Sequence, residues 1–179
     1  QFWPSPRSHH CSCSVDKYIF IYGGFTADDN KEVNELLSYD IETKMWKEIY
    51  CNSFIPPPLS NSCLITLNNS TFILYGGSSN EQLQKEMYQY DIKSNQWNIC
   101  RFKSSSYTNL EFHKSICKFS TILSNNALYI IGGTGDNSME HKEIVKITNI
   151  FDIGQSNTVL QFIKKIKKDS FLTDCNIHV

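Results

Sequence analysis

A glycine-pair motif recurs along the chain and constrains its fold more than any other feature. Apolar segments end in Gly23-Gly24, Gly76-Gly77 and Gly132-Gly133, so the first glycines of the pairs are 53 and 56 residues apart. The first two pairs are each followed by a Tyr-Asp dipeptide and by a tryptophan six residues beyond the Asp. These are Tyr39-Asp40 with Trp46, and Tyr90-Asp91 with Trp97. Such a period predicts repeated supersecondary units that stack on one another.

Apolar segments separated by turn residues predict four strands in each unit, joined as a meander. In the first unit we expect strands at 7–15, 18–22, 35–41 and 45–51, and in the second at 60–67, 71–75, 86–92 and 96–102. The third unit offers strands only at 114–123, 127–131 and 143–147, without Tyr-Asp or Trp. It is either the last blade of a closed ring or a diverged copy. We therefore predict an all-β fold of β-propeller blades at about 3–58, 59–112 and 113–149.

These three blades predict only part of a ring, because known propellers have roughly four to eight blades. The sequence begins at Gln1 and ends at Val179 without a terminating turn. We expect a segment of a longer protein whose other blades precede Gln1. An open array leaves blade faces without neighbours, so we also expect the segment to fold poorly alone.

The motif residues have a predicted structural role. Glycine permits positive φ and close approach of neighbouring backbone, and tryptophan on an outer strand can fill the space between adjacent blades. The residues assigned to this role are Gly23, Gly24, Tyr39, Asp40, Trp46, Gly76, Gly77, Tyr90, Asp91, Trp97, Gly132 and Gly133.

The composition changes after Asn149. Residues 150–158 suggest a linker, and apolar residues within 159–168 recur at helical spacing with four lysines mostly on the other face. That face is either simply solvated or a small patch for a membrane surface or nucleic acid. Beyond it, Cys175, Ile177 and Val179 alternate as at the start of a strand.

Charge and cysteine content exclude several classes of protein. With 17 basic and 18 acidic residues the net charge is -1, so no clustered charge favours nucleic acid. The apolar runs are strand-sized, so we expect no membrane span. The seven cysteines are scattered without a CxxC pair. They suggest free thiols in a reduced cytoplasm rather than a metal site.

The glycine-pair, Tyr-Asp and Trp pattern resembles kelch repeats over about residues 3–149. Residues 159–179, with Leu160, Phe162, Leu172, Asp174 and Val179, resemble the opening helix and first strand of a BTB (POZ) domain, although Cys175 replaces the usual aliphatic residue. Kelch repeats before BTB resemble the leucine-zipper-like transcriptional regulator family. That resemblance implies an adaptor whose propeller captures a protein substrate, while the BTB domain forms a homodimer and binds a cullin scaffold for ubiquitin transfer.

The strand order predicts where binding occurs. Loops between the second and third strands, and between blades, share one rim and are long, at 25–34, 52–58, 78–85, 103–113 and 134–142. Aromatic and acidic residues there would suit a partly basic protein partner. The candidate contact residues are Phe25, Asp28, Asp29, Phe54, Tyr107, Phe112, Asp136 and Glu140.

Two other functions stay open. A galactose-oxidase-like propeller enzyme needs converging metal ligands, which His9, His10, His113, His141 and His178 do not offer at ligand spacing. There is no nucleophile or phosphate-binding motif, so we expect neither catalysis nor a cofactor. A cytoskeletal or scaffolding kelch protein is the stronger alternative, and the residues that follow Val179 would decide between it and the adaptor.

Overall fold

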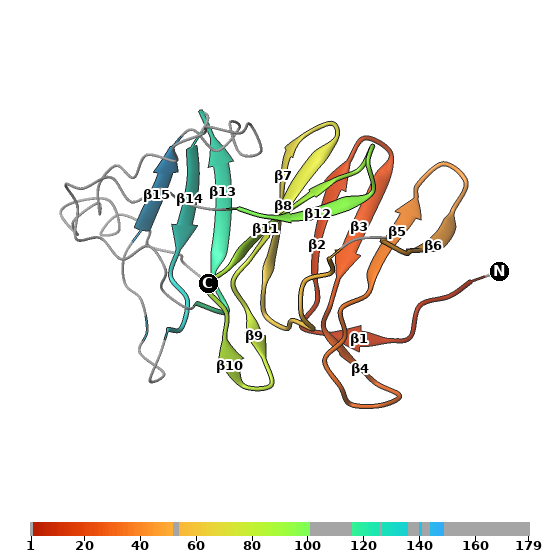
Figure 1. Ribbon diagram of the computed structural model, residues 1–179, viewed down its shortest axis with the longest axis horizontal. Helices are drawn as coiled ribbons and strands as arrows, with labels where there is room; N and C mark the ends of the chain where they lie inside the picture. Colours follow the sequence, from red (N-terminus) through yellow and green to blue (C-terminus); the bar gives the residue numbers. More distant parts are fainter. Residues whose placement is uncertain are drawn as a thin grey trace, which may run out of the picture.

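The structure, a computed structural model, describes residues 2–51, 54–100, 116–125, 127–135, 140 and 144–148. Three antiparallel sheets stand side by side, and the first strand of each lies beside the next sheet's first strand (Figure 1). In these ranges the chain forms strands and turns only, and no helix there could cross a membrane. The all-β prediction is therefore confirmed for this part of the chain, and the sheets are arranged as propeller blades are.

The first blade has the strand order β2-β3-β5-β6, the meander expected from sequence. Its strands are β2 (Cys11–Val15), β3 (Tyr18–Tyr22), β5 (Leu36–Asp40) and β6 (Met45–Ile49). The prediction of one strand over 7–15 was wrong. His9 has φ 57, a turn in the backbone, and separates β2 from β1 (Arg7–Ser8), which pairs with β4 (Phe25–Thr26) outside the blade.

The second blade repeats this order, β7-β8-β11-β12. Its strands are β7 (Cys63–Asn68), β8 (Thr71–Tyr75), β11 (Met87–Asp91) and β12 (Gln96–Ile99). All five residues of β8 are buried, as expected of a strand covered by a neighbouring blade on each face. The pairing of β7 with β8 shifts register between Thr66 and Asn68, so this inner strand holds one extra residue. A two-stranded hairpin of β9 (Ser78–Ser79) and β10 (Gln82–Leu83) extends beyond the blade.

The third blade shows three strands, in the order β13-β14-β15. They are β13 (Ser120–Ser124), β14 (Ala127–Ile131) and β15 (Ile144–Thr148). The predicted second strands of all three blades, 18–22, 71–75 and 127–131, are confirmed to the residue. The predicted linker, helix and BTB-like strand over 150–179 lie outside the described residues.

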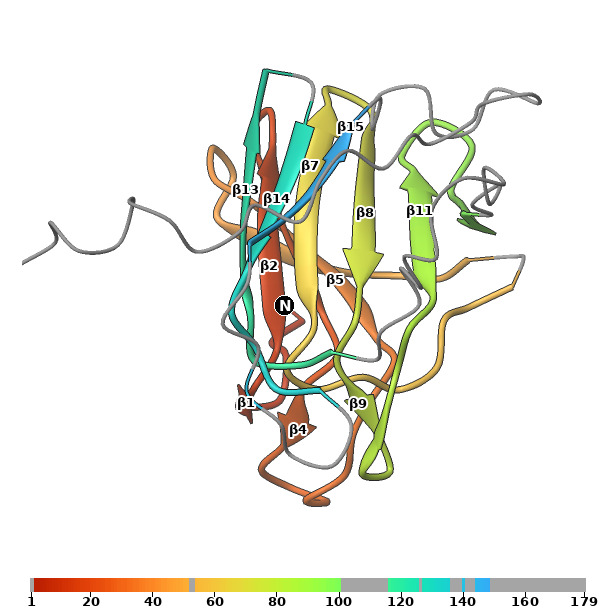
Figure 2. The same cartoon turned by 90° about the vertical axis from the view of Figure 1, so that its left-hand side faces the viewer.

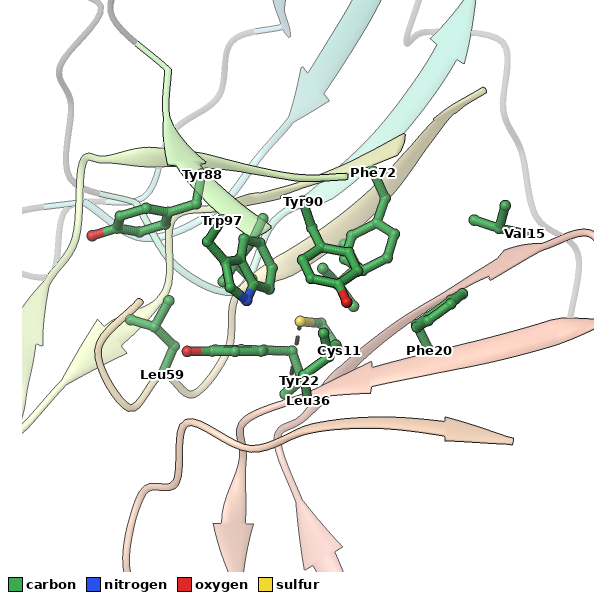
Figure 3. Close-up of a cluster of buried hydrophobic side chains, with 12 residues drawn as sticks. Cys11, Val15, Phe20, Tyr22, Leu36, Leu59, Phe72, Tyr88, Tyr90 and Trp97 are labelled. Carbon is green, nitrogen blue, oxygen red and sulfur yellow. Dashed lines mark hydrogen bonds between the residues drawn. The ribbon is translucent and has the colours of Figure 1, made fainter. Parts of the chain in front are cut away.

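Two apolar cores join the blades. The first lies between blades one and two, where Phe20 and Tyr22 of β3 meet Phe72, Tyr90 and Trp97 of blade two (Figure 3). The ring centroids of Trp97 lie 5.5 Å from those of Tyr22, 5.8 Å from Phe72 and 5.0 Å from Tyr90. The second core joins blades two and three through Tyr75, Met87, Leu128, Ile130 and Ile147, among others. Burial between sheets is thus what holds the array together.

The tryptophans of the repeat differ in burial. Trp97 is only 3% exposed and its side chain faces blade one. Trp46, at the same place in the first repeat, is half-buried and packs on Tyr39 at 4.9 Å between ring centroids. The described residues place no blade against this face of β6. The position of the tryptophan in the repeat therefore does not by itself decide whether its side chain is buried.

The Tyr-Asp dipeptides end the third strand of a blade, and their aspartates shape the turn that follows. The Asp40 carboxylate accepts hydrogen bonds from the backbone N–H of Glu42 at 2.9 Å and of Thr43 at 3.1 Å. Asp91 accepts from the Ser94 N–H at 2.7 Å in the same way. These bonds favour the charged carboxylate, so the pKa of both aspartates lies below its ordinary value.

The first two glycine pairs lie where a blade touches the segment that enters the next blade. The Gly24 N–H donates to the Leu59 carbonyl at 2.8 Å, and the Gly77 N–H to the Ile116 carbonyl at 2.7 Å. Gly76 has φ 65, and a Cβ there would lie 2.6 Å from the Ile116 oxygen. A side chain is therefore excluded both by backbone conformation and by space.

Candidate binding site on the long-loop rim

Each blade carries a small secondary sheet at the same end of the molecule. Immediately before its inner strand, one residue pairs with a residue just after the glycine pair: Ser8 with Phe25, Ser60 with Ser78, and Cys117 with Thr134. The residue after the glycine pair also pairs with a residue further along the chain: Phe25 with Glu32, Ser78 with Leu83, and Thr134 with Glu140. Figures 1 and 2 show β1, β4 and β9 together at this end. The rim is thus hydrogen-bonded secondary structure rather than open loop.

Successive blades are linked at this rim by backbone hydrogen bonds. The Asn61 N–H donates to the His9 carbonyl at 2.9 Å, and the Lys118 N–H donates to the Asn61 carbonyl at 3.2 Å. These three residues occupy equivalent positions and all have positive φ, at 57° for His9 and 54° for the other two. The blades therefore present three side chains from one repeated backbone position.

Glu32 fixes the first blade's rim to that of the second. Its carboxylate accepts from the Ser60 hydroxyl at 2.7 Å through one oxygen and from the Asn80 backbone N–H at 2.6 Å through the other. Ser60 is only 1% exposed and also lies 3.0 Å, hydroxyl to hydroxyl, from Ser78. Both carboxylate oxygens of Glu32 are thus engaged within the protein.

These elements enclose an open cavity of about 990 Å³. It spans all three blades, because its lining comes from the rim of each. The lining residues are Phe25, Asn30, Lys31, Glu32, Ser60, Asn61, Ser78, Asn80, Glu81, Gln82, Leu83, Cys117, Lys118, Thr134 and Gly135. Most of the lining residues are polar, and Phe25 and Leu83 are the two large apolar side chains among them. A cavity of this size accommodates a short stretch of polypeptide.

The sequence-predicted contact residues fall in four groups. Phe25 lines the cavity, and its ring lies edge-on to His9, 6.0 Å between centroids. Asp28 and Asp29 are exposed on the connection after β4, and Glu140 is exposed where it pairs with Thr134. Phe54 packs on Tyr88, 5.8 Å between ring centroids, and does not line the cavity. The remaining three, Tyr107, Phe112 and Asp136, lie outside the described residues.

Sequence reasoning missed the residues that contribute most of the cavity's polar surface, including Lys31, Asn61 and Lys118. A signal for two of them exists in the spacing. His9 and Lys118 each precede the first glycine of their own blade by 14 residues, and Asn61 does so by 15. The extra residue in β7 accounts for the difference. Aligning the repeats on their glycines would therefore have marked this position.

Three thiols of the inner strands, those of Cys11, Cys13 and Cys63, are buried or half-buried and have a raised pKa. Cys11 and Cys13 lie on β2, and burial raises the pKa of each to about 12, so both are neutral thiols at pH 7. Burial also raises the pKa of Cys63 on β7. In the part of the chain that the structure describes, no three His, Cys, Asp or Glu side chains could hold a metal together.

Comparison with known proteins agrees with this architecture. The family model of the KLHDC2/KLHL20/DRC7 Kelch-repeats domain matches residues 1–157. The chain is 28% identical over 139 residues to Ras guanine nucleotide exchange factor F of Dictyostelium discoideum, covering 77% of this chain and 12% of that protein. It is 28% identical over 98 residues to human Kelch domain-containing protein 2, covering 51% and 24% respectively.

A third relative combines kelch repeats with another domain in its name. Kelch repeat and BTB domain-containing protein 12 of Homo sapiens is 23% identical over 169 residues, covering 86% of this chain and 25% of that protein. The chain thus spans a quarter or less of each of these three relatives. Because the family model covers most of the sequence, and the repeats form the expected sheets, the chain belongs to the KLHDC2/KLHL20/DRC7 Kelch-repeats domain family.

Proposed function

We propose that this chain is a protein-recognition module that binds a polypeptide segment of its partner in the cavity of the long-loop rim. Kelch-repeat domains generally act in protein–protein interaction, and the chain carries one. The observation that carries the proposal is the cavity itself, about 990 Å³ and shared by the rims of three blades. Its walls are pre-organised by hydrogen bonds between blades, which lowers the entropy cost of binding.

Blocking the cavity tests this proposal. Gln82 lies on β10, is exposed and lines the cavity, so Gln82→Trp puts a large ring into it without removing a buried contact. Gln96→Trp on β12 is the matched control, because Gln96 is equally exposed on a strand but does not line the cavity. Tagged full-length protein is recovered from cells, and its partners are quantified by mass spectrometry. Partners lost with Gln82→Trp and kept with Gln96→Trp support the site. Equal recovery with both variants contradicts it.

The finer role that we propose is that of a cytoplasmic substrate adaptor for a cullin-RING ubiquitin ligase. Two observations support it: the resemblance of residues 159–179 to the start of a BTB domain, and the Kelch repeat and BTB relative aligned over 169 residues. In such an adaptor the rim holds the substrate, while the BTB domain forms the dimer and binds the cullin.

A truncation separates the adaptor from the scaffold alternative. Full-length protein is compared with a version ending at Asn149, again by affinity purification and mass spectrometry. A cullin that is present with the full-length protein and absent after truncation supports the adaptor, and the partners that persist are candidate substrates. Cytoskeletal proteins in both samples, without a cullin, would instead identify a scaffolding kelch protein.

A further inference from the structure

One of the three equivalent rim positions, Lys118, carries a residue that its backbone conformation does not favour. Positive φ suits glycine and, less strongly, asparagine and histidine, and it costs other residues about 1 kcal/mol. Asparagine and histidine are both enriched at positive φ, so Asn61 and His9 fit this preference, whereas Lys118 does not. Glycine would serve the backbone better at Lys118. Strained backbone positions are enriched at ligand-binding sites in proteins.

The Lys118 side chain makes no interaction with the described residues that would offset this strain. Its side chain is exposed and lines the cavity, and it forms no ion pair or hydrogen bond with the described residues. Its backbone N–H supplies the bond to Asn61, and glycine would supply that bond equally well. Among the described residues, none therefore competes with a ligand for the ammonium group.

A second lysine, Lys31, also lines the cavity. It likewise has no ion-pair partner in the described part of the chain. Of the two carboxylates in the lining, Glu32 already has both oxygens hydrogen-bonded. Glu81 lies at the turn of the β9–β10 hairpin, with φ 65. Lys31 and Lys118 are thus the two cations of the lining, and neither has an ion-pair partner among the described residues, whereas Asp28 and Asp29 lie outside the lining.

We propose that the cavity selects a peptide segment with an acidic side chain, which Lys118 and Lys31 bind and the Asn61 amide helps to orient. The inference rests on the proposed function and names the class of segment that the site accepts. Lysine ammonium groups bind carboxylates as point charges, so the selection concerns charge more than shape. The acidic residues outside the cavity then favour basic residues flanking the acidic one in the partner.

A randomised peptide library selected on the full-length protein tests this. The wild type should enrich Asp and Glu over their frequency in the starting library, and more strongly at low ionic strength. Lys118→Glu should abolish that enrichment, weaken binding of a selected acidic peptide roughly tenfold, and move selection towards Lys and Arg. Lys47→Glu on β6 is the control, since Lys47 is exposed and does not line the cavity.

Lys118→Gly separates binding from folding. It removes the charge and relieves the positive-φ strain, so the melting temperature should stay level or rise while acidic peptides bind less well. A fall in melting temperature would identify Lys118 as structural and overturn the inference. If Gln82→Trp blocks the enriched peptides but these show no preference for acidic residues, the inference of acidic selection is overturned, while the proposal that the cavity binds peptides stands. Peptides that bind regardless of Gln82→Trp would contradict the site itself.

Discussion

Removal of the Trp97 indole should open the interface between the first two blades. Trp97 is 3% exposed and its ring contacts those of Tyr22, Phe72 and Tyr90. A buried Trp→Ala substitution costs about 3–5 kcal/mol, through lost transfer energy and the cavity left behind. Since about 1.4 kcal/mol is a factor of ten, the population of the locally opened state should rise by roughly 10² to 10⁴.

Amide hydrogen exchange in the full-length protein, read by mass spectrometry, measures this opening without requiring a single global transition. Trp97→Ala should accelerate exchange in β3, β8 and β11, which line the first core. Strand β14 should change much less, because its buried residues belong to the second core.

The matched control is Trp3→Ala. Trp3 is 69% exposed, so the same chemical change should leave exchange unaltered. Acceleration confined to β12, or no greater than that of Trp3→Ala, would show that the aromatic cluster does not hold the blades together.

Three further outcomes follow from the blade contacts. Gly76→Ala should destabilise the protein by at least about 1–2 kcal/mol, seen as a lower melting temperature, because φ is 65 and the new Cβ would lie 2.6 Å from the Ile116 oxygen. A melting temperature within error of the wild type would refute that steric reasoning. Tyr22→Phe should cost about 1–2 kcal/mol in urea unfolding, since it removes the hydrogen bond that the Tyr22 hydroxyl donates to the Pro56 carbonyl at 2.8 Å, leaving a buried acceptor. No change would mean that water replaces the hydroxyl. Finally, burial raises the pKa of Cys11 to about 12, so the unfolded state releases this proton first as pH rises. Stability should be full below about pH 8.5 and fall towards pH 12, and Cys11→Ala should make the melting temperature decline less steeply; an unchanged slope would contradict the burial of this thiol.

The repeat pattern was enough to predict most of the strands. Short apolar runs bounded by turn residues mark strands that are covered on both faces, which is why β3, β8 and β14 were predicted to the residue. The inner strand of the first blade was predicted too long. A positive φ at His9 divides it, and histidine is too weak a signal for such a turn to end a predicted strand.

The candidate site was predicted only in part. The long loops predicted from the sequence contribute residues to the cavity's lining, and Phe25 is one of the predicted contact residues that line it. Loop residues were chosen for aromatic or acidic character, and most of the other lining residues have neither, while Glu32 and Glu81 are acidic and were still not named. Lys118 and Asn61 instead come from the start of inner strands, and reach the cavity only because the blades pack side by side.

The sequence by itself determined the repeat, the class of fold and the order of strands, because these depend on local spacing of apolar residues, glycines and turns. Only the tertiary structure decided which tryptophan is buried and which side chains share the cavity. Trp46 and Trp97 occupy the same place in their repeats, yet burial depends on the neighbouring blade that covers each. Likewise Lys31 and Lys118 are far apart in the chain, and stacking of the blades brings both into one cavity.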